Sequence, residues 1–376
     1  MSNITNAQNP FYGQYHTPHG TVPFDRIETE HYEPAILEGI KLQNAEIEAI
    51  IQNPEKADFT NTIEAFEESG ELLDKVVAVF GNMLSAETND DLQELAQKIM
   101  PLLSEHSNNI TLNEKLFARV KEVYNQKETL QLTQEQKQLL ENAYNSFVRH
   151  GANLEGEARE EYRRLTTELS KLTLTFSENN LKETNAYQML LTKKESLAGL
   201  PEIIIEAAAE TAKNEEKEGW AFTLHAPSYI PFMTYSDNRD LRQKLYMAYN
   251  TKCTHDNEFN NIDIVKKIAN TRMKIAQLLG YKDYAEYTLK KRMAENSKSV
   301  YKLLNQLLEA YTPTAQQEYK EIQELAREEQ GQKIQYQRRN APPLLRTGTS
   351  EERGVWLGRK VIWNHFPEKY RNSGLP

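Results

Sequence analysis

The clearest pattern in the chain is a helical repeat of apolar positions between residues 154 and 176. Apolar side chains recur there every three or four residues, which places them on one face of a helix of about six turns. The members of this stripe are Leu154, Ala158, Tyr162, Leu165, Leu169, Leu172 and Phe176. A further helix is predicted just before it, beginning at a capping box in which Thr133 precedes Gln136 by three residues.

Helical periodicity dominates the region 31–330, after an extended lead-in over residues 1–30. The other predicted helices cover 33–52, 62–85, 89–106, 113–127, 203–217, 238–253, 258–279, 283–292 and 297–329. Strand signals are confined to two short runs, Gln188–Thr192 and Trp220–Leu224, which we expect to pair as a ribbon. The predicted fold class is therefore all-α, mainly helical with one small β ribbon.

Charge divides the chain near residue 330. Residues 331–376 contain nine Lys or Arg, three Glu and no Asp, whereas residues 1–330 contain 36 basic and 52 acidic side chains. We therefore expect three parts: the lead-in 1–30, a helical region 31–330 and a basic tail 331–376 of unrelated character. The formal net charge of −10 argues against a general affinity for nucleic acid or for anionic membranes.

The expected compartment is the cytoplasm. The single cysteine, Cys253, excludes an internal disulfide and fits a reducing environment. The N-terminal residues have neither a basic start nor an apolar stretch, so we expect no signal peptide. No run of eighteen apolar residues is present, so we expect no membrane span.

The sequence offers no established catalytic motif. It lacks the His-Glu-x-x-His pattern of zinc hydrolases, the Gly-x-Ser-x-Gly nucleophile turn and both glycine-rich phosphate-binding loops. The eight histidines are His16, His19, His31, His106, His150, His225, His255 and His365. Only His16 and His19 lie close together, and their Pro- and Gly-containing segment favours a surface turn over a metal site.

Three other groups of residues that could carry chemistry each have a structural interpretation. The run His255-Asp256-Asn257-Glu258 is interpreted as a loop that caps the next helix, with ligand binding as the alternative. His150 ends a helix before Gly151, where a cation favours the helix dipole. Cys253 is expected to be a packed small side chain rather than a nucleophile paired with His255, because positions i and i+2 of a helix face apart.

Tyrosines recur at intervals of three residues near the end of the helical region. Tyr281, Tyr284 and Tyr287 are interpreted as a packed helix face before any ligand cage. From its residues alone, we assign this chain no catalytic, cofactor-binding or metal-binding residue.

Several segments are too distinctive to be generic helix. They include Asn9-Pro10-Phe11, His31-Tyr32-Glu33-Pro34-Ala35, Phe59-Thr60-Asn61-Thr62-Ile63, Phe147-Val148-Arg149-His150-Gly151-Ala152, Gly219-Trp220-Ala221-Phe222-Thr223-Leu224 and Pro227-Ser228-Tyr229-Ile230-Pro231-Phe232. Together these segments resemble the thimet-oligopeptidase family of zinc metallopeptidases, in particular bacterial peptidyl-dipeptidase and oligopeptidase A. The resemblance extends in order over about residues 9–330.

The resemblance implies the N-terminal part of a two-lobed helical peptidase whose channel admits short peptides. Enzymes of the peptidyl-dipeptidase type remove C-terminal dipeptides with a zinc-bound water and a glutamate as the base. The family's zinc ligands and its substrate-holding Tyr and His lie beyond the resembling segment. No such role is therefore transferred to this chain, which is expected to hold no cofactor and to be inactive alone.

We interpret the tail 331–376 as an out-of-frame translation. The residues Lys360–His365, read one base later, necessarily encode a glycine and permit Leu-Tyr before it and Ile after it. Leu-Tyr-Gly-Ile resembles a stretch expected in the family just beyond residue 330. A genuine basic, disordered extension is the alternative.

Two classes of function follow from these observations. The first is a truncated zinc-dependent oligopeptidase, whose intact form hydrolyses short peptides. The second is a non-catalytic helical protein that binds peptides or a partner. A nucleic-acid-binding or partner-binding arm in the tail is a third, weaker interpretation, and the oligomeric state is left open.

Overall fold

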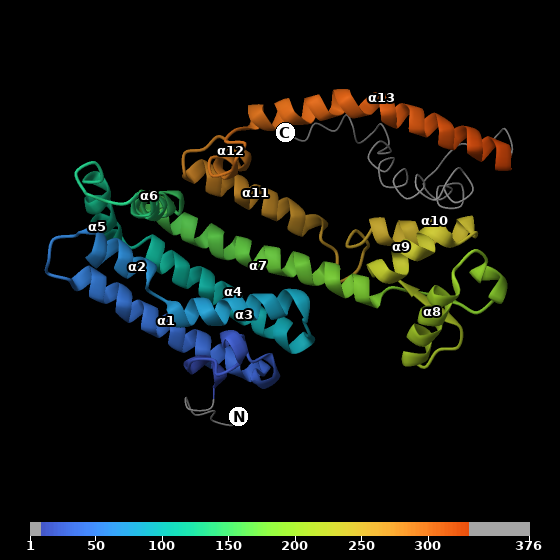
Figure 1. The fold of residues 1–376 in the computed structure, drawn as a ribbon, viewed down its shortest axis with the longest axis horizontal. Helices are drawn as coiled ribbons and strands as arrows, with labels where there is room; N and C mark the ends of the chain where they lie inside the picture. Colours follow the sequence, from blue (N-terminus) through green and yellow to red (C-terminus); the bar gives the residue numbers. More distant parts are fainter. Residues whose placement is uncertain (1–8, 331–376) are drawn as a thin grey trace. The chain divides into compact units, whose positions relative to one another are not determined.

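The structure is a computed structural model that describes residues 9–330, so the basic tail 331–376 lies outside the described residues (Figure 1). Over residues 9–330 the fold is mainly helical, with one two-stranded antiparallel sheet, and the predicted all-α class is confirmed. No helix in the described part of the chain combines the length and the apolar character that a membrane crossing requires.

The chain forms two compact units, and each is described by itself. Unit 1 comprises Met1–Phe176 and Ile264–Tyr287, and unit 2 comprises Ser177–Asp263 and Thr288–Pro376. The helix α7 (Gly156–Ala186) contributes residues to both units.

The helices of unit 1 pack, in the described part of the chain, around three hydrophobic clusters, and the two larger ones combine aromatic and aliphatic side chains. Its elements are α1 (Thr29–Gln52), the π-helical η5 (Phe59–Glu64), α2 (Ala65–Glu67), α3 (Glu71–Ala86), α4 (Asp90–Thr111), α5 (Glu114–Asn125), α6 (Gln134–Arg149), and most of α11 (Ile262–Leu278) and α12 (Tyr284–Leu289). In one core the buried ring of Tyr32 lies between Phe11 and Phe80, with centroid distances of 5.4 and 5.2 Å. In the other, Leu140 and Phe147 of α6 pack on α5 and η5.

Unit 2 is organised around the predicted ribbon. Its elements are β1 (Gln188–Leu191), α8 (Glu202–Asn214), β2 (Trp220–Thr223), α9 (Ala226–Tyr235), α10 (Arg239–Asn250) and α13 (Ser297–Gln330). The strands pair antiparallel from Gln188 opposite Thr223 to Leu191 opposite Trp220, which confirms the ribbon. Phe222 of β2 is fully buried against Phe232 of α9, with ring centroids 4.6 Å apart.

Local sequence signals explain where several helices begin and end. The capping box at α6 is confirmed, because Thr133 Oγ1 accepts from the Gln136 amide at 3.2 Å and Gln136 Oε1 accepts from the Thr133 amide at 3.0 Å. The predicted helix 62–85 is interrupted at Gly70, whose φ of +86° favours glycine. The Gly70 amide leaves the helical pattern and donates to Glu46 Oε2 at 2.8 Å.

The helix α9 of unit 2 was not predicted by the pattern. It contains Pro227 in its first turn, where proline is tolerated, and Pro231 in its interior, where proline removes a backbone donor. The predicted helix 238–253 ends at Asn250, because Cys253 adopts a left-handed conformation with φ of +58°. These differences are local and leave the helical class unchanged.

Candidate functional site

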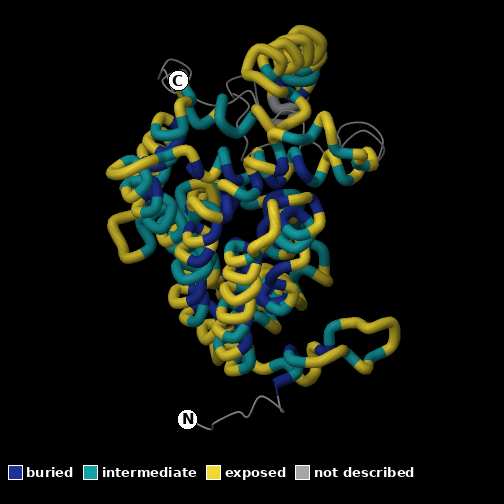
Figure 2. The backbone as a smooth tube through the Cα atoms, turned by 90° about the vertical axis from the view of Figure 1, so that its left-hand side faces the viewer, coloured by how far each residue is buried: buried dark blue, intermediate teal, exposed yellow. Residues whose placement is uncertain are grey.

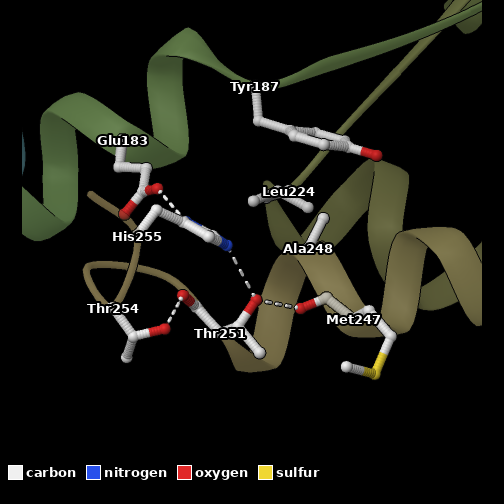
Figure 3. A pocket seen from close by; sticks show the side chains of 8 residues that line it. All are labelled: Glu183, Tyr187, Leu224, Met247, Ala248, Thr251, Thr254 and His255. Atoms are coloured by element: carbon white, nitrogen blue, oxygen red, sulfur yellow. Dashed lines mark hydrogen bonds and ion pairs between the residues drawn. The ribbon is translucent and has the colours of Figure 1, made fainter. Parts of the chain in front are cut away.

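A pocket of about 460 Å³ lies within unit 2 (Figure 3). Apolar side chains line one part of it, and hydroxyl, imidazole and carboxylate groups line the other. The lining residues are Glu183, Tyr187, Leu224, Met247, Ala248, Thr251, Thr254 and His255. This mixture is typical of small ligand sites, in which a few polar groups fix orientation beside an apolar wall.

Two helices and a turn position the polar part of the pocket. Glu183 lies in the last turn of α7, and Thr251 is the C-cap of α10. The left-handed turn at Cys253 then reverses the chain, so that His255 returns toward α7. The Asn261 amide donates to the Cys253 carbonyl at 2.8 Å and closes the loop.

The Glu183 carboxylate is the centre of a hydrogen-bond network. Its Oε1 lies 2.7 Å from His255 Nδ1 and accepts from Asn257 Nδ2 at 3.4 Å, and its Oε2 accepts from the Cys253 amide. The Glu183 side chain is 12% exposed. Burial by itself raises the pKa of the carboxyl, but the hydrogen bonds from His255, Cys253 and Asn257 outweigh it and lower the pKa. The network therefore keeps Glu183 ionised at neutral pH.

Thr251, His255 and Glu183 form a hydroxyl–imidazole–carboxylate series that resembles the order of groups in a hydrolase triad. Thr251 Oγ1 lies 3.2 Å from His255 Nε2 and donates to the Met247 carbonyl at 2.7 Å. That second bond is the usual attachment of a helical threonine to its own helix, and it uses the only hydroxyl proton. The series therefore anchors the 251–257 loop to α7, and we assign it no catalytic step.

The Cys253 thiol is not an activated nucleophile. Its side chain is buried, and burial together with contact to Glu183 raises the pKa of the thiol to about 11. The thiolate is the reactive form of cysteine, so the Cys253 side chain is protonated and inert at neutral pH. Cys253 and His255 do approach one carboxylate, because the chain has left the helix at that point.

The structure places the other candidate residues in ordinary structural roles. His19 lies at φ of +60° in the exposed turn Pro18–Gly20 that follows His16. His150 is the C-cap of α6, with Nδ1 2.7 Å from the Ser146 carbonyl oxygen.

Two of the three tyrosines of the 281–287 segment contact cations of the chain itself, and the third packs against one of those two rings. The guanidinium of Arg149 lies 4.2 Å from the Tyr287 ring centroid, and Arg149 Nη2 donates to the Tyr287 carbonyl at 2.9 Å. Tyr284 receives Arg272 at 5.4 Å, and Tyr281 packs edge-on against Tyr287 at 5.3 Å. Arginines of the chain itself thus occupy the faces of Tyr284 and Tyr287 on which a ligand cation could otherwise lie.

The residues present do not fit the zinc that the resemblance implies. Within residues 9–330, no group of three or more His, Cys, Asp or Glu side chains is arranged to hold a metal ion. The whole sequence also lacks a His-Glu-x-x-His pattern. We therefore derive no chemical step through a metal from this chain.

Sequence reasoning did not single out Glu183. The polar run beginning at His255 gave a signal, but its partner lies 72 positions earlier in the chain. Glu183 is one glutamate among many on a long helix, and nothing in its immediate neighbours indicates the contact.

Comparison with known proteins supports the family resemblance. Residues 232–338 match the family model described as Peptidase family M3. Oligopeptidase A of Salmonella typhimurium is 30% identical over 86% of this chain and 48% of its own length. Dipeptidyl carboxypeptidase of Escherichia coli is 34% identical over 86% of this chain and 48% of its own. Oligopeptidase A of Haemophilus influenzae is 31% identical over 83% of this chain and 46% of its own length.

The chain spans about half the length of these curated relatives. The matched family segment begins within α9, includes all of α10 to α13 and ends at residue 338, beyond the described residues. The resemblance inferred from the sequence motifs is confirmed: this chain carries a Peptidase family M3 segment and is homologous to oligopeptidase A and dipeptidyl carboxypeptidase over most of its own length.

Proposed function

We propose that this chain is the non-catalytic half of a zinc-dependent oligopeptidase of the peptidyl-dipeptidase type and is inactive by itself. One observation carries the proposal: the chain is homologous over 86% of its length to a peptidase of which it covers only 48%. The absence of a His-Glu-x-x-His pattern supports the same interpretation, since that pattern supplies both metal ligands and the base.

The proposal includes the substrate and the location of the intact protein. The intact counterpart hydrolyses short peptides in the cytoplasm and releases C-terminal dipeptides, with zinc bound by the part that this chain lacks. Residues 331–376, in this proposal, are an out-of-frame translation that replaces the authentic continuation. The reversal of charge balance near residue 330 supports this part of the proposal.

A peptidase assay and a zinc measurement test the proposed inactivity. The purified chain is incubated with short fluorogenic peptides in the presence and absence of added zinc, with the Escherichia coli dipeptidyl carboxypeptidase as the positive control. We expect no cleavage above buffer and less than one-tenth of a zinc ion per chain. Cleavage by the chain that is lost on treatment with a chelator would refute inactivity.

The nucleotide sequence from about codon 320 to the region downstream of codon 376 tests the truncation. We expect a second reading frame that encodes Leu-Tyr-Gly-Ile followed by His-Glu-x-x-His. An uninterrupted frame with no such sequence in either alternative frame would overturn the truncation and leave a short protein as the gene's product.

A non-catalytic peptide-binding protein is the second candidate, and the pocket beside Glu183 favours it. Leu224, Met247 and Ala248 line the same pocket as the imidazole of His255, so it offers partners to both an apolar side chain and a polar end group of a peptide. Titration of short peptides by calorimetry tests this candidate. Saturable binding that His255→Ala weakens tenfold would favour it over the truncated enzyme.

A further inference from the structure

The first half of α13 exposes an apolar face along about two turns of helix. Tyr301, Leu304 and Leu308 are 62%, 51% and 63% exposed. Leu303 and Leu307, which are 58% and 38% exposed, lie between them on the same side. Figure 2 shows α13 mainly in the colour of exposed residues. We call these five residues the α13 stripe.

The α13 stripe has the pattern of a surface that is normally covered. Its members recur at spacings of three and four residues, as on a helix face directed toward a core. The opposite side of the same turns carries Lys298, Lys302 and Glu309, which suit water. Contiguous exposed apolar patches of this kind mark contact surfaces in proteins, whereas single exposed leucines do not.

We propose that the α13 stripe is the docking surface for the polypeptide that forms the other half of the peptidase. This inference rests on the proposed function. Two observations identify the occupant: the matched family segment 232–338 includes all of α13, and about half the length of each relative has no counterpart in this chain. The partner surface is accordingly a helical one with its own apolar face, supplied by that missing half.

A two-polypeptide experiment tests the proposal. The full chain carries an affinity tag and is co-expressed with the part of Escherichia coli dipeptidyl carboxypeptidase that this chain does not match. Leu304→Glu/Leu308→Glu introduces two charges into the α13 stripe. Asn305→Glu/Gln306→Glu places the same two charges on the polar side of the same helix and serves as the matched control. Far-ultraviolet circular dichroism verifies that both variants keep the parent's helix content.

The expected result is a one-to-one complex with the parent chain and with the control. The stripe variant is expected to bind at least tenfold more weakly. Failure of the parent to retain the co-expressed polypeptide, or equal retention by parent and stripe variant, overturns the docking proposal. So does a homodimer of the parent that the stripe variant alone converts to monomer, because the stripe then pairs with a second copy.

Failure of docking and failure of the proposed function are distinguishable. Chelator-sensitive peptide cleavage by the chain alone would contradict the proposed function, whatever the complex shows. If the chain is inactive and forms no complex, the docking proposal is overturned. The truncation is then still decided by the nucleotide sequence.

Discussion

At the residue scale, the titratable groups that make stability depend on pH are those whose hydrogen bonds form only in the folded chain. His106 of α4 is buried, and its Nε2 lies 2.7 Å from Gln43 Oε1 of α1. Glu183 accepts three hydrogen bonds in the other unit. Burial lowers the pKa of His106, and hydrogen bonding lowers that of Glu183 against the effect of burial, so both groups resist protonation in the folded state.

His106 is expected to make stability depend on pH just below neutrality. An unfolded histidine binds a proton near pH 6.5, whereas the folded state, with its lowered pKa, binds that proton only at lower pH. The stabilising contribution is therefore complete above about pH 7 and declines as the pH falls through about 6.5. Urea unfolding at pH 5 to 8 should show this slope in the parent and in the control His16→Gln. A similar slope in His106→Gln would contradict the assignment.

The Glu183 carboxylate is expected to stabilise the folded chain at neutral pH and to lose this stabilising effect in acid. Its lowered pKa means that its contribution is present above the unfolded value and is lost as the pH falls through the folded value. Glu183→Gln should reduce the free energy of unfolding by about 1–3 kcal/mol at pH 7 and by less near pH 3. Glu258→Gln, an exposed change in the same loop, is the control. Equal effects of the two substitutions at pH 7 would exclude the network as the cause.

At the element scale, helices with a continuous apolar stripe and a side-chain cap were predictable from the sequence. The capping box at Thr133 and the ribbon partners of β1 and β2 are local patterns, so they could be located before the structure. The helix α9 was not predicted, because prolines at 227 and 231 argue against a helix unless packing on β2 and α8 stabilises it. The contact of Glu183 with His255 was missed for a related reason, since it depends on a backbone turn far along the chain.

Gly219 illustrates how one residue permits an element to form. Its φ is +117°, and a Cβ atom there would lie 2.3 Å from the carbonyl oxygen of Leu191, at the end of β1. Gly219→Ala should therefore lower the free energy of unfolding by about 3 kcal/mol through backbone strain and the clash at the ribbon. Gly81→Ala, within a helix where a Cβ meets nothing within 4 Å, should instead stabilise by about 0.5–1 kcal/mol. Chemical denaturation of both variants measures whether each substitution raises or lowers the free energy of unfolding. A Gly219→Ala variant as stable as the parent would show that the ribbon shifts to accommodate the added Cβ atom.

At the scale of the whole molecule, each unit has a core of its own. Phe80 is 1% exposed in a core of unit 1, and Phe222 is fully buried in the core of unit 2. Truncation of either ring to alanine removes a large buried side chain and should cost about 3–5 kcal/mol. Regions with separate cores open with separate free energies, so each truncation should act on its own unit.

Native-state hydrogen exchange tests this independence segment by segment. Phe222→Ala is expected to reduce amide protection in residues 188–248 while residues 29–149 keep the parent's protection. Phe80→Ala is the reciprocal control and should produce the opposite pattern. The helix α7 is informative in both variants because it contributes residues to both units. If both variants lowered protection equally in every protected segment, the chain would unfold as one cooperative body. A confined effect would show instead that each unit keeps its fold when the core of the other is weakened.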